Sequence, residues 1–515
     1  MSATTSVEDA PRLTREQVLL LASLLVGTFV VILNETTMSV ALPVLQSSFG
    51  VGAATGQWLT TAFLLTMGSV IPLTGFLIQR VPTRVLFLVA MGLFAAGTLL
   101  AALAPVFSVL LVARIIQASG TAIMVPLLMT TVMEVVPVAR RGQMMGNITV
   151  VIAVAPALGP TVSGLVLDTL GWRWIFGSML PIALLVTALG ARYVVPIAES
   201  RRTRIDLLSV PLAVVGFGAL VYGLSSIGES AEGGHAVPVW LPFVVGVAAL
   251  VAFVVRQLAL QREDRALLDL RVFAARGFPL ALGATLIAML TMLGTFILVP
   301  YFAQQALAMD PLTTGLLTLP GGLLMGALGP VVGRIYDARG PRVLLVPGSL
   351  LVTGALWLLS TVSVDTGFGT LAAAFVLLSV GIATLMTPLM TVALGSVPQP
   401  LYSHGSAILS TLQQVAGAAG TALFVTVMTV VATASPGGVE SREGIAEGVS
   451  TAFMVAGCIA LVLVALVPFV RRPAETPAGT PAGDPTGTPT GTERTDGDAT
   501  RAADRPADER ATVAP

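Results

Sequence analysis

Two ionisable side chains lie inside apolar stretches where charge is costly. Glu35 follows Asn34 in the apolar run from about residue 18 to 43, and Arg114 lies in the run at 106–133. A charge at mid-membrane depth costs at least about 2.5–3.5 kcal/mol, so each group must face a partner, a proton or a water-filled cavity. Together they could bind a proton in one conformation and release it in another.

Spacing from the ends of the two runs puts Glu35 and Arg114 at similar depth. Glu35 lies eight residues before Pro43, and Arg114 lies nine residues after Pro105. At 1.5 Å per residue both are roughly 12–14 Å below the outer surface, a depth at which they can meet. We interpret the pair as a proton-coupling site in which Arg114 stabilises the carboxylate. The alternative is a static buried ion pair, although such pairs stabilise weakly.

Composition indicates an integral membrane protein. Hydrophobic residues make up 55% of the 515 residues and charged residues only 10%, against roughly 25% charge in soluble domains. All 27 basic residues are arginine, which excludes the lysine of a Walker-type phosphate loop. No hydrolytic or metal-ligand motif occurs, and one cysteine cannot form an intrachain disulfide. We therefore expect neither an enzyme nor an ATP-driven pump, and no cofactor or metal.

Fourteen apolar runs are long enough to cross a bilayer as helices. An even number places both termini on one side. Arginine is abundant in the segments on that side, whereas the opposite loops hold only Arg173 and Arg442, so we expect both termini in the cytoplasm. The alternative is twelve spans with two buried or re-entrant segments. The runs lie at 18–42, 57–79, 84–104, 106–133, 143–167, 174–195, 207–228, 239–258, 278–303, 313–333, 343–361, 368–393, 405–432 and 449–470.

Two similar loops indicate an internal repeat. GFLIQRVPTR runs from Gly75 to Arg84, and GRIYDARGPR runs from Gly333 to Arg342. Each follows the second helix of a six-helix block if the runs at 207–228 and 239–258 are an insertion. Parallel halves of this kind place a substrate site at the midplane between them. The predicted parts are a cytoplasmic N-terminus (1–17), a six-helix bundle (18–195), a linker with two extra helices (196–276), a second six-helix bundle (277–470) and a disordered Pro/Gly/Thr-rich cytoplasmic tail (471–515).

Four motifs in this order resemble those of the major facilitator superfamily, in its fourteen-span drug:proton antiporter branch. They are LNETTMSVALP with Glu35 at the acidic position, the loop motif, ARIIQASGTA around Arg114, and APALGPTVSG at 155–164, which GWRWIF follows. The resemblance covers roughly residues 15–470. It implies an all-α major facilitator fold with 14 transmembrane helices arranged as 6+2+6 in two pseudo-symmetric halves.

The loops depart from the family pattern in one half only. The first copy has Gln79 and Pro82 where the family has Asp and Gly, whereas the second keeps Asp337 and Gly340. Glycine permits a tight turn and charges can hold two halves together, so we expect the second half to dominate gating. Positive-inside anchoring and ordinary helix packing are the alternatives. The predicted gating residues are Gly75, Arg80, Arg84, Gly159, Pro160, Gly164, Gly333, Asp337, Gly340 and Arg342.

Several side chains on the predicted helices could line a substrate pocket, because Met and aromatic groups adapt to varied apolar ligands. Each could instead pack or face lipid. The candidates are Asn34, Met38, Phe63, Met124, Tyr301, Gln304 and Gln413. The resemblance implies a transporter in the cytoplasmic membrane that exports amphipathic or cationic drug-like compounds by alternating access. The proton gradient would drive the export. We expect a monomer without a nucleic-acid partner.

Three alternatives to drug export remain open. The same fold could export a lipid or an endogenous metabolite, it could import a solute by symport, or the protein could be a transport-inactive sensor or assembly factor. The Gly159–Pro160 pair and Glu35 argue against symport.

Overall fold

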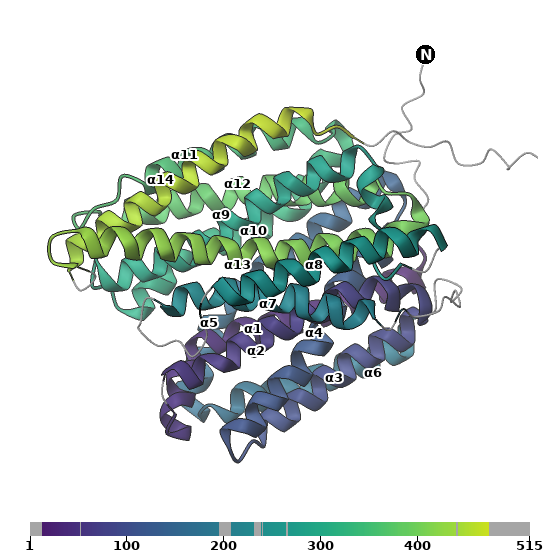
Figure 1. Cartoon of the computed structure of the whole chain (residues 1–515), viewed down its shortest axis with the longest axis horizontal. Helices are drawn as coiled ribbons and strands as arrows, with labels where there is room; N and C mark the ends of the chain where they lie inside the picture. The colour runs from purple at the N-terminus through teal and green to yellow at the C-terminus, as the bar shows by residue number, and fades with distance from the viewer. Residues whose placement is uncertain are drawn as a thin grey trace, which may run out of the picture. The chain divides into compact units, whose positions relative to one another are not determined.

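The computed structural model describes residues 13–51, 53–194, 206, 208–230, 238, 240–263, 266–438 and 441–472. Within these ranges the chain forms fourteen α-helices, short 3-10 turns and no strands (Figure 1). The described residues between 13 and 472 belong to one compact unit. The predicted all-α class is therefore confirmed, and the predicted tail lies almost wholly outside the described residues.

The first six helices are those expected to form the N-terminal bundle. Twelve of the fourteen helices are long and apolar enough to span a membrane; α5 and α7 are the other two. α1 continues through position 43 to Phe49, so the predicted end at residue 42 is wrong. The bundle consists of α1 (Arg15–Phe49), α2 (Ala53–Arg80), α3 (Thr83–Ala102), α4 (Phe107–Val135), α5 (Arg141–Leu170) and α6 (Arg173–Tyr193).

The last six helices are those expected to form the second bundle. α10 begins at the cap Asp310, whose side chain accepts from the Thr313 N–H at 2.8 Å, and it ends at Gly340 with φ +78°. A left-handed backbone favours glycine at that turn. The bundle consists of α9 (Gly277–Gln305), α10 (Pro311–Arg339), α11 (Arg342–Leu359), α12 (Phe368–Gly395), α13 (Tyr402–Ala434) and α14 (Arg442–Leu466).

The two extra helices, α7 (Ser209–Ser230) and α8 (Trp240–Leu260), pack against each other, and α7 also packs against α2 and α13 (Figure 1). The Ser69 hydroxyl of α2 donates to the Val214 carbonyl of α7 at 3.4 Å. The rings of Trp58 and Tyr222 stack with centroids 5.9 Å apart. α2 and α13 belong to the two different bundles expected from the sequence, and α7 lies against both.

A polar network lies where α7 starts and α8 ends. Arg256 of α8 donates two hydrogen bonds to the Asp206 carboxylate, each at 2.6 Å. Gln257 donates to the Ser209 hydroxyl at 2.7 Å and accepts from the Leu267 N–H at 2.7 Å. The network therefore ties the start of α7 to α8 and to the segment that leads to α9.

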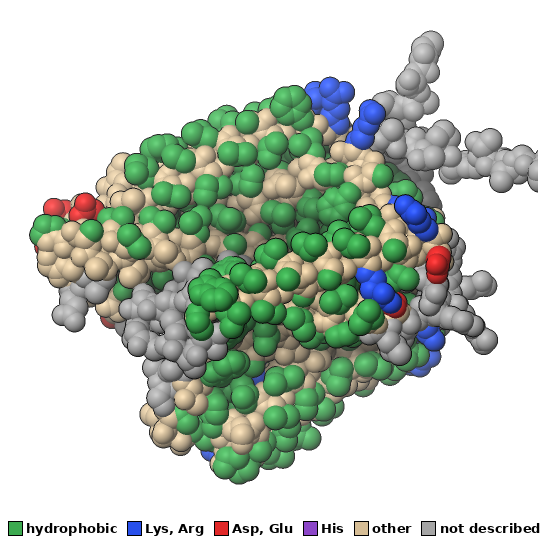
Figure 2. Space-filling view, viewed as in Figure 1, with side chains coloured by type: hydrophobic (Ala, Val, Ile, Leu, Met, Phe, Trp, Pro, Cys, Tyr) green, Lys and Arg blue, Asp and Glu red, His purple; other side chains and the backbone are tan. Residues whose placement is uncertain are grey.

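Charge is distributed unequally along the bundle. In Figure 2 most of the visible basic side chains gather at one end, acidic ones appear at both ends, and apolar side chains cover the surface between the ends. On α8, for example, Val247, Val251 and Val255 are all more than half exposed. Exposed apolar flanks between polar ends are what a lipid-embedded bundle requires.

Candidate functional site

Arg114 is enclosed by α1, α2 and α4 and is only 1% exposed. Its Nη1 donates to Gln117 Oε1 at 2.7 Å and to Asn34 Oδ1 at 3.4 Å. Its guanidinium carbon lies 4.1 Å from the centroid of the Phe63 ring, within the range of a cation–π contact. Two predicted pocket residues, Asn34 and Phe63, therefore hold this arginine.

Gln117 extends the network to α3. Its amide nitrogen donates to the Thr98 hydroxyl at 2.8 Å, which in turn donates to the Phe94 carbonyl at 2.6 Å. In the part of the chain that the structure describes, Arg114 Nε and Asn34 Nδ2 have no hydrogen-bond partner. Buried donors are nearly always paired, so two orphaned donors in one cluster point to a water or substrate oxygen there.

Glu35 lies on α1 beside this network and is partly exposed. The carboxylate and the Arg114 guanidinium interact electrostatically. Among the described residues, no hydrogen bond or ion pair joins them. Because α1 reaches Phe49, Glu35 also lies nearer the middle of its helix than the sequence suggested. In this conformation Glu35 and Arg114 are neighbours, but they do not form the direct ion pair that their similar predicted depth in the membrane made possible.

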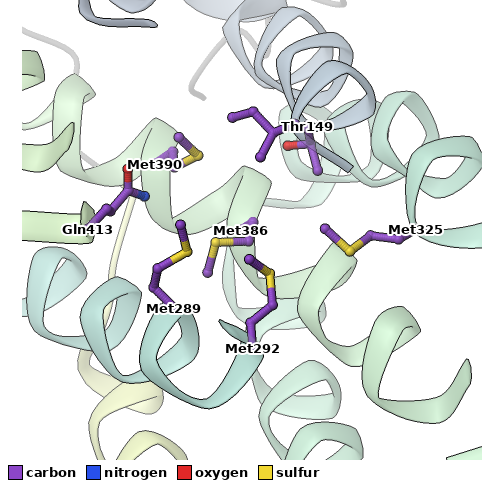
Figure 3. A pocket seen from close by; sticks show the side chains of 8 residues that line it. Thr149, Met289, Met292, Met325, Met386, Met390 and Gln413 are labelled. Carbon is purple, nitrogen blue, oxygen red and sulfur yellow. The ribbon is translucent and has the colours of Figure 1, made fainter. Parts of the chain in front are cut away.

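A small cavity lies where α5 meets α9, α10, α12 and α13 (Figure 3), and the empty space of about 350 Å³ around it includes open solvent. Its lining comes from both bundles, as expected of a midplane site between two halves. Five of its eight lining residues are methionine. The lining is Met289 and Met292 on α9, Met325 on α10, Met386 and Met390 on α12, Thr149 and Ile152 on α5, and Gln413 on α13.

Gln413 is the one predicted pocket residue that lines this cavity. None of the five methionines is among the pocket residues predicted from the sequence, although their spacing carried a signal. Met289 and Met292 are three apart and Met386 and Met390 four apart, so each pair shares a helix face.

The other predicted pocket residues lie elsewhere. Met38 packs in a buried cluster with Leu59 and Trp172. Met124 belongs to the main core and lies close to Gly27 of α1. Tyr301 and Gln304, near the end of α9, are exposed.

The predicted gating residues of the second loop meet the first half at the α5–α10 seam. Asp337 accepts from the backbone N–H of Gly142 and of Gln143, each at 2.9 Å, and thus caps the start of α5. A carboxylate at a helix N-terminus is favoured by the orphan donors and the dipole. At Gly333 an added Cβ would lie 2.2 Å from the Gly142 carbonyl, so the backbones touch directly. The Asp337 carbonyl also accepts from Arg472 at 3.3 Å.

The first loop meets the second half at the α2–α13 seam with neutral groups. Gln79 donates to the Pro400 carbonyl at 3.1 Å, and Gly75 packs against the start of α13 at Ser403. Arg84 donates to the Ala191 carbonyl within its own half. Arg80 lies over the Phe76 ring, and Arg342 is exposed. These contacts of Arg84 and Arg80 lie within the first half, as expected if the loop arginines only anchor the cytoplasmic side by the positive-inside rule.

The α5 motif has one close neighbour. At Gly159 an added Cβ would lie 2.2 Å from Thr36 Oγ1, so α5 and α1 approach closely there. Gly164 has no atom within 4 Å of its would-be Cβ. The side chain of Pro160 lies outside the described residues.

Comparison with known proteins identifies relatives over most of the chain. The model of the Major Facilitator Superfamily matches residues 24–421. Lincomycin resistance protein LmrB of Listeria monocytogenes is 39% identical over 441 residues, which cover 86% of this chain and 91% of that protein. LmrB of Bacillus subtilis is 38% identical over 452 residues, covering 86% and 93%.

A relative of lower identity and a solved structure of similar fold also match the chain. A multidrug resistance protein B homolog of Mycobacterium tuberculosis is 28% identical over 425 residues, covering 81% of this chain and 78% of that protein. The crystal structure of the human organic anion transporter MFSD10 matches with a TM-score of 0.63 and 16% identity, covering 88% of this chain and 99% of that one. At that identity the likeness concerns the fold alone.

Proposed function

Because the chain belongs to the Major Facilitator Superfamily, we propose that it exports drug-like compounds across the cytoplasmic membrane in exchange for protons. The observation that carries the proposal is the 38–39% identity, over nearly the whole length, to proteins named for lincomycin resistance. Family members are transporters rather than enzymes. Lincomycin is accordingly the first compound to test.

The proposed architecture is a monomer of fourteen spans arranged as six, two and six, with both termini in the cytoplasm. The fourteen α-helices among the described residues support the number of spans, although only twelve of them also meet the length and apolar character of a span. The gathering of basic side chains at one end of the bundle supports the orientation (Figure 2). The α5–α10 seam, with Asp337 and Arg472, then lies at the cytoplasmic end and is closed in this conformation.

The proposed coupling group is Glu35. Its carboxylate has no fixed partner among the described residues, so it can accept a proton without breaking a hydrogen-bonded ion pair. When the halves rock, a closer approach of Arg114 would favour the ionised form and release the proton. Exchange follows if proton and substrate favour opposite conformations. The orphaned donors of Arg114 and Asn34 support a binding role for this cluster as well.

A growth assay tests the proposed cargo. A host lacking its main exporters would express the wild-type chain, Glu35→Gln or an empty vector, and would be challenged with lincomycin and a panel of unrelated toxic compounds. We expect the wild type to raise the inhibitory concentration of several compounds severalfold and Glu35→Gln to raise none. Protection against no compound, together with altered membrane lipids or secreted metabolites, would favour the endogenous-cargo alternative.

A further inference from the structure

We propose that Arg141 and Tyr402 hold the start of α13 against the first half of the protein, in place of a capping carboxylate that position 79 lacks. This inference rests on the proposed function, because it assigns two further residues to the gating of the transport cycle. Neither residue is among the gating or pocket residues predicted from the sequence.

The two similar loops meet the starts of equivalent helices, because α5 and α13 are the fifth helices of the two expected bundles. A Cβ added at Gly333 would lie 2.2 Å from the Gly142 carbonyl at the start of α5. A Cβ added at the matching Gly75 would lie 3.2 Å from the Ser403 carbonyl at the start of α13. The second seam therefore repeats the geometry of the first, with the two backbones less close.

The loops differ in what they offer these helix starts. Asp337 accepts from the N–H groups of Gly142 and Gln143, each at 2.9 Å. Gln79 occupies the matching position of the first loop and donates to the Pro400 carbonyl instead. Among the described residues, no side-chain acceptor pairs with the first N–H groups of α13. Because such groups need an acceptor and favour negative charge, this loop does not hold α13 as Asp337 holds α5.

Arg141, the first residue of α5, makes a different contact with the start of α13. Its Nη1 donates to the Tyr402 hydroxyl at 3.2 Å, and its guanidinium carbon lies 5.6 Å from the centroid of the Tyr402 ring. Both distances are within the ranges of a hydrogen bond and a cation–π contact. Tyr402 is itself the first residue of α13 and is buried. The pair therefore joins two helix starts directly, one from each half.

The first half fixes the guanidinium in place. Its Nε donates to the Val136 carbonyl at 3.2 Å and its Nη2 to the Met133 carbonyl at 2.7 Å, both at the end of α4. Carbonyls at a helix C-terminus lack partners within the helix and attract a cation. The planar fork of Arg141 thus binds α4 through two nitrogens and directs the third toward Tyr402.

This arrangement links the pair to the conformational cycle. Separation of the two halves at this end must break the contact between Arg141 and Tyr402, whereas the contacts of Arg141 with α4 lie within one half and can persist. The pair therefore stabilises the closed state relative to the open state.

Distance measurements between spin labels test the role of the pair without requiring transport. The purified full-length protein in nanodiscs, in a Cys458→Ser background, would carry labelled cysteines at Val138 and Gln399, which are exposed near the starts of α5 and α13. We expect Tyr402→Leu to lower the ratio of closed to open molecules about tenfold, since the bond from a charged donor and the ring contact are both lost. Arg140→Gln, which removes a neighbouring charge and keeps the contact, should change the ratio by less than about twofold.

A smaller change separates the two parts of the contact. Tyr402→Phe keeps the ring and removes the hydroxyl, so it should lower the ratio by a smaller factor, about threefold. It leaves the contacts of Arg141 with α4 intact, and it serves as the test if Tyr402→Leu does not fold.

A restored carboxylate tests whether the pair takes the place of the missing cap. Gln79→Glu in the Tyr402→Leu background would offer an acceptor to the N–H groups of Ser403 and His404. Glutamate is chosen because the backbones are less close here than at the other seam. Two hydrogen bonds to this helix start would resist rotation of α13 on α2, so we expect the ratio to return to within about threefold of the wild type.

An unchanged ratio in both tyrosine variants, an equal shift in Arg140→Gln, or no recovery with Gln79→Glu would overturn the inference. A protein that exports drugs but shows an unchanged ratio loses this inference and keeps the proposed function. A protein whose distances change as expected but that exports nothing keeps the inference and loses the proposed function.

Discussion

The α5–α10 seam and the α2–α13 seam join the same two bundles through different chemistry. At the first, the Asp337 carboxylate accepts two backbone N–H groups at 2.9 Å and glycine backbones touch. At the second, a neutral hydrogen bond runs from Gln79 to the Pro400 carbonyl at 3.1 Å, and α7 packs against both helices. Hydrogen bonds to an ionised group are roughly twice as strong as neutral ones.

This difference assigns the seams different parts in a transport cycle. The α5–α10 contact is strong and local, so losing it would change the balance between open and closed states. The α2–α13 contact is weak in itself, but α7 packs against both of these helices and supports the contact. We therefore expect the α5–α10 seam to act as the latch, meaning the contact that must break when the protein opens on that side. We expect the α2–α13 seam to stay in contact while the helices rotate about it.

The largest expected effect concerns the side of the membrane on which the latch lies. In a Cys458→Ser background, a cysteine introduced at Arg339 beside the latch should be inaccessible to an impermeant thiol reagent added to intact cells. A cysteine at Asp365, in the exposed segment between α11 and α12, should react nearly completely. Reversed labelling would put the latch at the outer face and reverse the proposed orientation.

The next largest effect is expected at the backbone contact of the latch. A Cβ at Gly146 would lie 2.2 Å from the Gly329 carbonyl, so Gly146→Ala must force the two helices apart. Overpacking costs about 1–3 kcal/mol, so we expect transport in vesicles to fall about tenfold or more at equal protein level. Gly92→Ala on α3, where no atom lies within 4 Å of the new Cβ, is the matched control. Wild-type transport by Gly146→Ala would remove this contact from the mechanism.

A moderate effect is expected from the charge of the latch. Asp337→Asn keeps the shape but removes the ionised acceptor, at a cost of about 1.5 kcal/mol, which corresponds to roughly a tenfold shift toward the open state. Gln79→Ala at the other seam should reduce transport by less than about twofold, since one partly exposed neutral bond is lost. Transport rates normalised to protein amount compare the two. Equal losses would contradict the difference between the seams.

The smallest effect is expected at the Asp206–Arg256 pair, which joins the start of α7 to α8. The Arg256 guanidinium, through its two hydrogen bonds, holds the pKa of the Asp206 carboxyl well below its ordinary value. A depressed carboxyl pKa contributes stability that is present above the ordinary range and is lost only as the pH falls toward the folded-state value. Asp206→Asn should therefore lower the free energy of unfolding by about 1 kcal/mol at neutral pH, seen as a small drop in the melting temperature. An unchanged melting temperature would show that this pair does not stabilise the packing of α7 against α8.

The sequence could predict the helices because a membrane-spanning segment must be a continuous apolar run. It placed the end of the first helix wrongly, because Pro43 was taken as a terminus. A proline removes one backbone bond, yet membrane helices tolerate it where neighbouring helices satisfy the freed groups.

The site could be predicted only in part. Asp337 was identified as a gating residue, but its partner Gly142 lies 195 residues away, and nothing in local spacing reveals such a contact. In the sequence, each methionine of α9, α10 and α12 is indistinguishable from an ordinary core residue. Only the packing of these helices brings the methionines around one cavity. Glu35 and Arg114 were recognisable because buried charge is rare in a membrane, whereas the roles of Asn34, Phe63 and Gln117 around the arginine depend on the fold.

Uphill transport in vesicles tests the central claim, proton-driven export through Glu35, most directly. Inside-out vesicles carrying the wild-type chain or Glu35→Gln would receive an acid-inside pH gradient and labelled lincomycin. The wild type should accumulate lincomycin above the outside concentration and lose it when the gradient is collapsed. Glu35→Gln, matched in protein amount, should reach only the outside concentration. Accumulation by Glu35→Gln at the wild-type rate would contradict the account and place the proton site elsewhere.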